Sequence, residues 1–229
     1  MGKLYSDIDD SLRSFIEAQR VFFVATATSS PDGLLNLSPK GLDSLRILGA
    51  HSLAYQDFVG SGAETIAHLR QNGRIVLMFC SFEGPPRILR LYGRGEAIEP
   101  QDPGFPALRN HFPVASGVRS IIRVEVERIA DSCGYGVPLF RFEGQRTQLT
   151  AWAEHKGPDG LADYQRRHNA ASLDGLPALR WTDPSARPVA IHQSFIHCLT
   201  PASAAAGTPS ARRSSPRSPS RAALRTGTG

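Results

Sequence analysis

The hydrophobic pattern changes its period early in the chain. In DDSLRSFIEAQ, Leu12, Phe15 and Ile16 fall on one helical face, which predicts a helix that Asp9 or Asp10 can cap. VFFVATAT (21–28) is rich in β-branched and aromatic residues, which predicts a strand. The chain therefore begins with a helix and then continues as sheet.

LLNLSPKG, after the turn signal SSPDG, predicts the returning strand of a hairpin. Side chains alternate along a strand, so Leu35 and Leu37 should face one side. Asn36, Ser38 and Lys40 should face the other, which makes that side polar.

Several more strands follow, mostly joined by short turns. SLRIL, HSLAYQD, ILRLYGRGEAIE and SIIRVEVERI all predict strands, and RIVLMFCSF is so continuously apolar that we expect it to be central and covered on both faces. Helices are expected after Ser61, around 103–112, and over 149–157 and 159–175. Many short strands with few helices predict a mainly β (α+β) fold, a closed or nearly closed antiparallel barrel.

Composition divides the chain into three parts. Residues 1–180 have the pattern of one folded domain, 181–200 read as an irregular extension, and 201–229 form an Ala/Ser/Pro/Arg-rich tail that we expect to be disordered. The net charge is +5, and five of the 26 basic residues lie in that tail, so the rest balances the 21 acidic residues. We therefore expect no specific nucleic-acid partner.

The cysteines and the start of the chain bear on location. Cys80, Cys133 and Cys198 are scattered and form no CxxC pair, which indicates reduced thiols in a cytoplasmic protein. The start is charged, and the apolar run at 21–27 is too short to span a bilayer. We expect neither a signal peptide nor a membrane partner.

The stretch FVGSGAETIAHLR has two interpretations. Ser61 with Glu64 matches a capping box, which would satisfy the first amides of the helix without a ligand. Alternatively, Ser61, Gly62 and Thr65 could offer hydroxyl and N–H groups to a phosphate, because a helix N-terminus carries partial positive charge. The spacing alone favours the cap.

Two cationic sites are also open to interpretation. Lys40 could hold a phosphate or polarise a ring oxygen, or it could belong to an outward polar edge. Arg90 shares a strand face with Tyr92 and Arg94, beside glycines that often mark a bulge or a barrel corner. The seven histidines predict no metal site, and His192 and His197 beside Cys198 are interpreted as a chance cluster.

Four segments occur together in order: LNLSPKG, VGSGAET, FEGPPRILRLYGRG and SCGYGVP. From about Asp7 to about Leu179 the chain closely resembles the FMN-binding split-barrel proteins related to pyridoxamine 5'-phosphate oxidase. The resemblance implies a six-stranded antiparallel split β-barrel with flanking helices, a homodimer, and FMN in a groove between subunits. It implies a flavin-dependent oxidoreductase that acts on a small-molecule substrate or electron donor.

The resemblance also assigns cofactor-binding residues, while the catalytic residues stay unknown. The strand along the flavin corresponds to Asn36, Leu37, Ser38 and Lys40. The phosphate loop corresponds to Gly60, Ser61, Gly62 and Thr65. Tyr55 or Asp57 would touch the ribityl chain, and Arg90 would assist with the anion.

The chain departs from the vitamin B6 oxidase in two segments. That oxidase has a cationic pair where this chain reads VGSGAET, and a basic C-terminal substrate segment that has no counterpart here. Pyridoxamine phosphate is therefore not the expected substrate. A deazaflavin or haem in place of FMN, a non-catalytic carrier, and a barrel that has lost its ligand all stay open.

Overall fold

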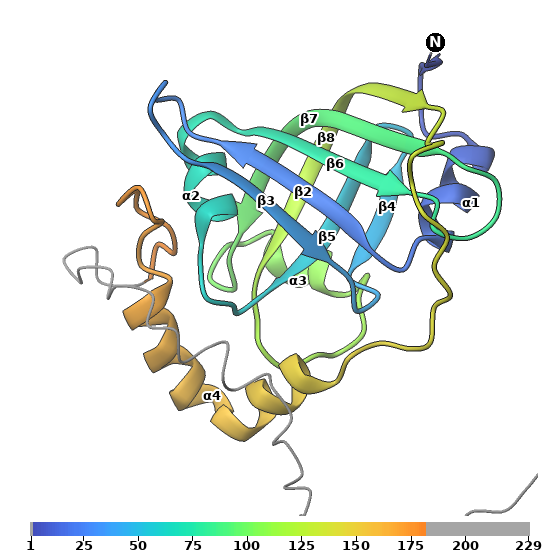
Figure 1. Cartoon of the computed structure of the whole chain (residues 1–229). Helices are drawn as coiled ribbons and strands as arrows, with labels where there is room; N and C mark the ends of the chain where they lie inside the picture. The colour runs from blue at the N-terminus through green and yellow to red at the C-terminus, as the bar shows by residue number, and fades with distance from the viewer. Residues whose placement is uncertain (1, 182–229) are drawn as a thin grey trace, which may run out of the picture.

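A computed structural model describes residues 2–181 of the chain (Figure 1). The expected extension at 181–200 and the tail at 201–229 lie, apart from Trp181, outside the described residues. The elements in chain order are β1 (Leu4–Tyr5), α1 (Asp10–Ala18), β2 (Phe22–Ala27), β3 (Leu35–Lys40), β4 (Leu45–Gly49), β5 (Ser52–Phe58), α2 (Glu64–Asn72), β6 (Arg74–Cys80), β7 (Ile88–Ile98), α3 (Phe105–Arg109), β8 (Val118–Ser132) and α4 (Gln148–His168).

The strands form one antiparallel sheet, which confirms the mainly β class. Its order is β3-β2-β6-β7-β8-β5-β4, and β1 pairs with β8. The sheet has eight strands where six were expected, and its hydrogen-bonded path is open between β3 and β4. It still curls around one core, because β7 (11 residues) and β8 (15 residues) are long enough to serve both halves.

The helices begin and end where local chemistry allows. Asp9 caps α1 by accepting a hydrogen bond from the backbone N–H of Leu12 at 2.8 Å. α2 ends at Gly73, whose φ of 70° suits glycine. The two predicted C-terminal helices are one element with a break at Gly157, and it ends at His168 instead of continuing to 175. Beyond it the chain turns back, with a bridge between Ala171 and Pro177.

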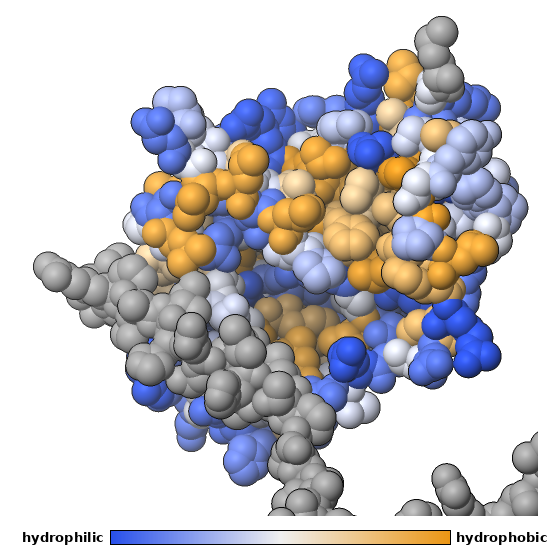
Figure 2. Space-filling view, in the orientation of Figure 1, coloured by the Kyte–Doolittle hydropathy of each residue, from blue (hydrophilic) through white to orange (hydrophobic). Residues whose placement is uncertain are grey.

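One face of the sheet is buried and the other is open. The inner face carries the core, including Val24, Leu77 and Leu91, each with no exposed surface. On the outer face, Val76 and Met78 of β6 are only half-buried, so the prediction that this strand is covered on both faces is not met within the described chain. Figure 2 shows apolar surface along this side of the sheet.

α4 lies across the end of the sheet where β8 begins, outside the barrel (Figure 1). Its residue Gln165 and Arg119 of β8 line the same cleft. In the described part of the chain, none of the helices is long and apolar enough to cross a bilayer.

Candidate functional site

The polar side of β3 faces inward, toward β5 and α2. Along this strand Leu35 and Leu37 are exposed, whereas Asn36, Ser38 and Lys40 are half-buried, as the alternation predicts. β3 is an edge strand and β5 lies near the other end of the sheet, so the polar row borders the open side of the barrel. Figure 2 shows the surface hollowed between the β3 side and α4.

Asn36 is the centre of a hydrogen-bond network. Its Nδ2 donates to the hydroxyls of Thr26 and Thr65, each at 3.0 Å, and its Oδ1 accepts from Ser38 Oγ at 2.9 Å. This network joins β2, β3 and α2, and it fixes the orientation of the Asn36 amide.

A buried histidine extends that network. His68 of α2 has no exposed surface, and its Nδ1 lies 3.1 Å from Thr26 Oγ1. Its Nε2 faces Asp174 Oδ2 at 3.7 Å, and Asp174 also accepts from the backbone N–H of Leu34. The segment after α4 is therefore held against the start of β3.

Asp57 binds two cations in the interior. Lys40 Nζ donates to its Oδ1 at 2.9 Å, and Arg119 Nε donates to its Oδ2 at 2.8 Å. Burial alone would raise the pKa of the Asp57 carboxyl, but Arg119 and Lys40 together lower it to about 2. The group therefore carries two positive charges and one negative charge at neutral pH.

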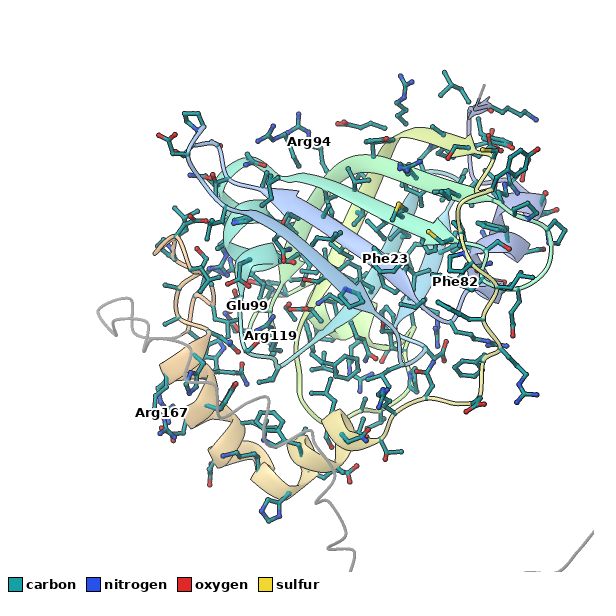
Figure 3. The ribbon with its side chains drawn as sticks, in the orientation of Figure 1. Phe23, Phe82, Arg94, Glu99, Arg119 and Arg167 are labelled. Atoms are coloured by element: carbon teal, nitrogen blue, oxygen red, sulfur yellow. The ribbon has the colours of Figure 1, made fainter. Side chains whose placement is uncertain are left out.

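Arg119 was not predicted as a site residue from the sequence. Ser120 faces inward, toward Asp57, so strict alternation along β8 would place the side chain of Arg119 on the outer face. A register shift between Asp57 and Phe58 leaves Arg119 as an extra residue on β8. Such a bulge can turn a side chain to the other face. Its guanidinium also donates to the backbone oxygen of Gly62 at 2.7 Å, and Figure 3 shows the side chain between α2 and α4.

The loop 60–65 does not contain the predicted capping box. The N-cap of α2 is Ala63, and no side chain caps the helix, because helical geometry begins two residues later than a Ser61 cap requires. Instead of reaching back to an N-cap, the Glu64 carboxylate lies against Gly62. Ser61 is exposed.

The backbone oxygens of this loop are bonded to protein donors, whereas its N–H groups have no acceptor among residues 2–181. The oxygens of Gly60 and Gly62 accept hydrogen bonds from Asn169 Nδ2 and Arg119. Within residues 2–181, the N–H groups of Ser61, Gly62 and Ala63 donate to no acceptor. Consecutive N–H groups of this kind can bind an anion.

Tyr55 lies beside this group on β5. Its hydroxyl is fully buried and lies near the hydroxyl of Thr65. Burial, with the negative charge of Asp57, raises the pKa of this hydroxyl well above its ordinary value. Lys40 Nζ is 6.0 Å from the centre of the Tyr55 ring.

The chain carrying this site matches a known protein family. Residues 8–133 match the family model described as "Pyridoxamine 5'-phosphate oxidase". The pyridoxamine 5'-phosphate oxidase family protein ustO of Aspergillus flavus is 39% identical over 196 residues, which is 78% of each chain. The chain belongs to the pyridoxamine 5'-phosphate oxidase family.

Solved structures resemble this family member more distantly. HupZ of Group A Streptococcus is 24% identical, with a TM-score of 0.44, over 53% of this chain and 91% of its own. An FMN-binding protein from Syntrophomonas wolfei is 18% identical, with a TM-score of 0.38, over 56% of this chain and 85% of its own. Family membership rests on the sequence matches.

Not every residue assigned from the family resemblance lies in this site. The structure brings Asn36, Ser38, Lys40, Tyr55 and Thr65 to one inner face, beside loop 60–65. Leu37 instead faces out from the other side of β3.

Arg90 also lies outside this group. It pairs in register with Met78 on the outer face of the sheet, and its guanidinium donates to Ser132 Oγ at 3.1 Å. Within one chain the alternation of β7 keeps Arg90 on the face opposite the polar row, and its assignment as a cofactor-binding residue stays a prediction.

The structure offers this family member no metal centre in its described part. None of the groups of His, Cys, Asp and Glu between residues 2 and 181 could hold an ion. The sequence cluster of His192, His197 and Cys198 lies outside those residues. Cys80 is buried and Cys133 is exposed, and both are free thiols.

Proposed function

We propose that this protein binds FMN at the open side of the barrel and serves as a flavin-dependent oxidoreductase on a small-molecule substrate. The observation that carries the proposal is the position of the donors at loop 60–65. Three backbone N–H groups that have no acceptor among residues 2–181 lie at the same loop as the guanidinium of Arg119, and Lys40 shares a carboxylate with that guanidinium. The N–H groups and the two cationic side chains are complementary to the negative charge of a phosphate ester.

The residues at this site fit FMN in kind. The loop with Arg119 and Lys40 would hold the phosphate, and the hydroxyls of Ser38 and Thr65 would suit the ribityl chain. Glu64 counts against the fit while its carboxylate lies against Gly62, but no hydrogen bond or ion pair in the described chain holds it there. Bound FMN would supply hydride or electron transfer, and the protein would bind and orient it.

A homodimer on the split-barrel fold belongs to the same proposal. The outer sheet face exposes 83% of Leu35 and 66% of Leu37, and these residues line a groove with Val76 and Tyr92. A contiguous apolar face of this kind marks an interaction surface, and a second copy would place two such faces together. Arg90, on the same face, would then lie near the partner subunit.

A non-catalytic carrier of flavin, deazaflavin or haem is the second candidate. It is favoured by the titratable groups of the site, since Asp57 is bound by two cations and Tyr55 is buried with a raised pKa. Neither group is set to exchange a proton with a ligand at neutral pH.

A visible spectrum of the purified protein tests the proposal. After FMN is added and the excess removed, we expect flavin absorption near ~450 nm, and bleaching by NAD(P)H or a substrate would indicate the oxidoreductase. A band at ~420 nm would indicate that the bound cofactor is a deazaflavin instead of FMN, and a Soret band would indicate haem. Protein that stays colourless with all three ligands would reject cofactor binding.

A further inference from the structure

We propose that a pocket between α1 and β4, which we call the α1 pocket, binds a small aromatic carboxylic acid. The pocket has a volume of about 330 Å³, which suits a small molecule. Its walls come from α1, β2, β4 and β6 and from the loop 41–44 that joins β3 to β4. Neither Lys40, Arg119 nor loop 60–65 lines it, so this ligand would be distinct from FMN.

The floor of the α1 pocket is apolar and largely aromatic. Phe22 of β2 and Phe79 of β6 are buried, and their rings stack with centroids 5.7 Å apart. Ile16 of α1 and Leu45 of β4 add aliphatic surface to the same pocket. Aromatic side chains favour an aromatic ligand, because its ring can pack on them in an offset or edge-to-face arrangement. The floor therefore indicates a ligand with a ring.

Ser44 places a polar group without a partner on the wall of the pocket. It is only 3% exposed, and its hydroxyl has no hydrogen-bond partner among residues 2–181. Its backbone oxygen accepts a hydrogen bond from the N–H of Gln56 at 2.8 Å, which holds Ser44 at this position. Buried hydroxyls are generally hydrogen-bonded, because removing them from water is otherwise unfavourable. A polar group on the ligand would supply the missing partner of the Ser44 hydroxyl.

The loop that carries Ser44 has an uncommon backbone conformation. Leu42 and Asp43 are both left-handed, with φ of 62° and 53°, and such residues persist only where the surrounding structure holds them. Here Arg46 binds both carboxylate oxygens of Asp43, each at 2.9 Å, and also its backbone oxygen at 3.1 Å. This pair fixes the shape of the pocket wall, and its two charges compensate each other.

Arg20 gives the mouth of the pocket a positive charge. It is exposed and forms no ion pair among residues 2–181, and its guanidinium carbon lies 5.4 Å from the centre of the Phe142 ring. Glu17, also at the mouth, already pairs with Arg13 at 3.7 Å. A planar guanidinium is complementary to a carboxylate, and a single cation suits a group with one negative charge.

The test measures the binding of para-hydroxybenzoate to the full chain by isothermal titration calorimetry, with no flavin added. This probe has one ring, a carboxylate for Arg20 and a hydroxyl for Ser44. We expect a dissociation constant below about 1 mM. Benzoate lacks the hydroxyl and para-hydroxybenzamide lacks the charge, so each should bind about fivefold more weakly.

Two variants assign these differences to the α1 pocket. Ser44→Ala should remove the preference for para-hydroxybenzoate over benzoate, and Arg20→Gln should remove its preference over para-hydroxybenzamide. Each variant should leave the other ratio unchanged, a pattern that general destabilisation cannot produce. Ser14→Ala and Arg123→Gln are the matched controls, because both side chains are exposed and lie outside the pocket, and both should keep the wild-type ratios.

The proposal is overturned if the wild type binds none of the three probes. It is also overturned if Ser44→Ala and Arg20→Gln both keep the wild-type ratios, since the probes would then bind elsewhere. Because no flavin takes part in this test, protein that binds FMN but none of the probes would reject the α1 pocket and leave the proposed function standing.

Discussion

Lys40 Nζ lies 2.9 Å from Asp57 Oδ1, and this ion pair joins two strands that form no ladder with each other. Lys40 ends β3 at one edge of the sheet, and Asp57 lies near the end of β5, one strand from the other edge. The pair therefore bridges the open side of the barrel. The stability of that side of the barrel should therefore depend on this ion pair.

Asp57 should make the protein sensitive to strong acid. Because its pKa is lowered to about 2 in the folded state, its contribution is complete above the ordinary value of 3.8 and is lost as pH falls toward 2. The shift corresponds to about 2 kcal/mol. Urea unfolding of wild type and Asp57→Asn should show a stability difference that is constant from pH 5 to 7 and decreases below pH 4, and an unchanged difference at pH 2.5 would contradict the lowered pKa.

The outer face of the sheet should form the interface of the proposed homodimer. Leu37→Asp places a charge among the residues that line the groove, where a partner subunit would have to bury it. We expect the dimer dissociation constant to rise at least about tenfold, measured by light scattering over a dilution series. Leu139→Asp is the control, since Leu139 is 76% exposed in the connection between β8 and α4. Equal effects of the two variants would exclude this face as the interface.

Gly93 should tolerate no side chain. It lies at a second bulge, where β7 shifts its register against β8, and an added Cβ would fall on the backbone oxygen of Glu125. Gly93→Ala should lower the free energy of unfolding by more than about 2 kcal/mol, because backbone on both strands must move. Gly104→Ala is the comparison, since a Cβ there meets no atom within 4 Å. Similar stability of the two variants would show that the bulge relaxes easily.

Local patterns identified much of the fold. The Asp9 cap, the hairpin of β2 and β3, and the alternation that turns Asn36, Ser38 and Lys40 inward all depend on neighbours in sequence. The glycines in β7 indicated a bulge or a barrel corner, and the register shift between Tyr92 and Gly93 shows a bulge. Such features are readable because backbone geometry fixes them within a few residues.

Other predictions were wrong where residues far apart in the chain form hydrogen bonds with the segment concerned. Ser61 does not cap α2. It lies in a loop where the backbone oxygens of Gly62 and Gly60 accept hydrogen bonds from Arg119 of β8 and from Asn169 at the end of α4. The helix expected to continue to 175 ends at His168, and Asp174 beyond it turns toward His68 and Leu34. Nothing in the local sequence marks those partners, which lie about 60 to 140 residues away in the chain.

The mainly β class, the position of most strands and the polar row on β3 could all be predicted from the residues alone, because each follows from the period of apolar residues along a strand. That Arg119 turns to the inner face while Arg90 stays on the outer face became visible only in the folded chain. A one-residue bulge reverses the face of the sheet that a side chain occupies. The curl of the sheet then brings Lys40 of β3 and Arg119 of β8 to the carboxylate of Asp57 on β5. The spacing of these residues in the sequence predicts neither the bulge nor the two ion pairs with Asp57.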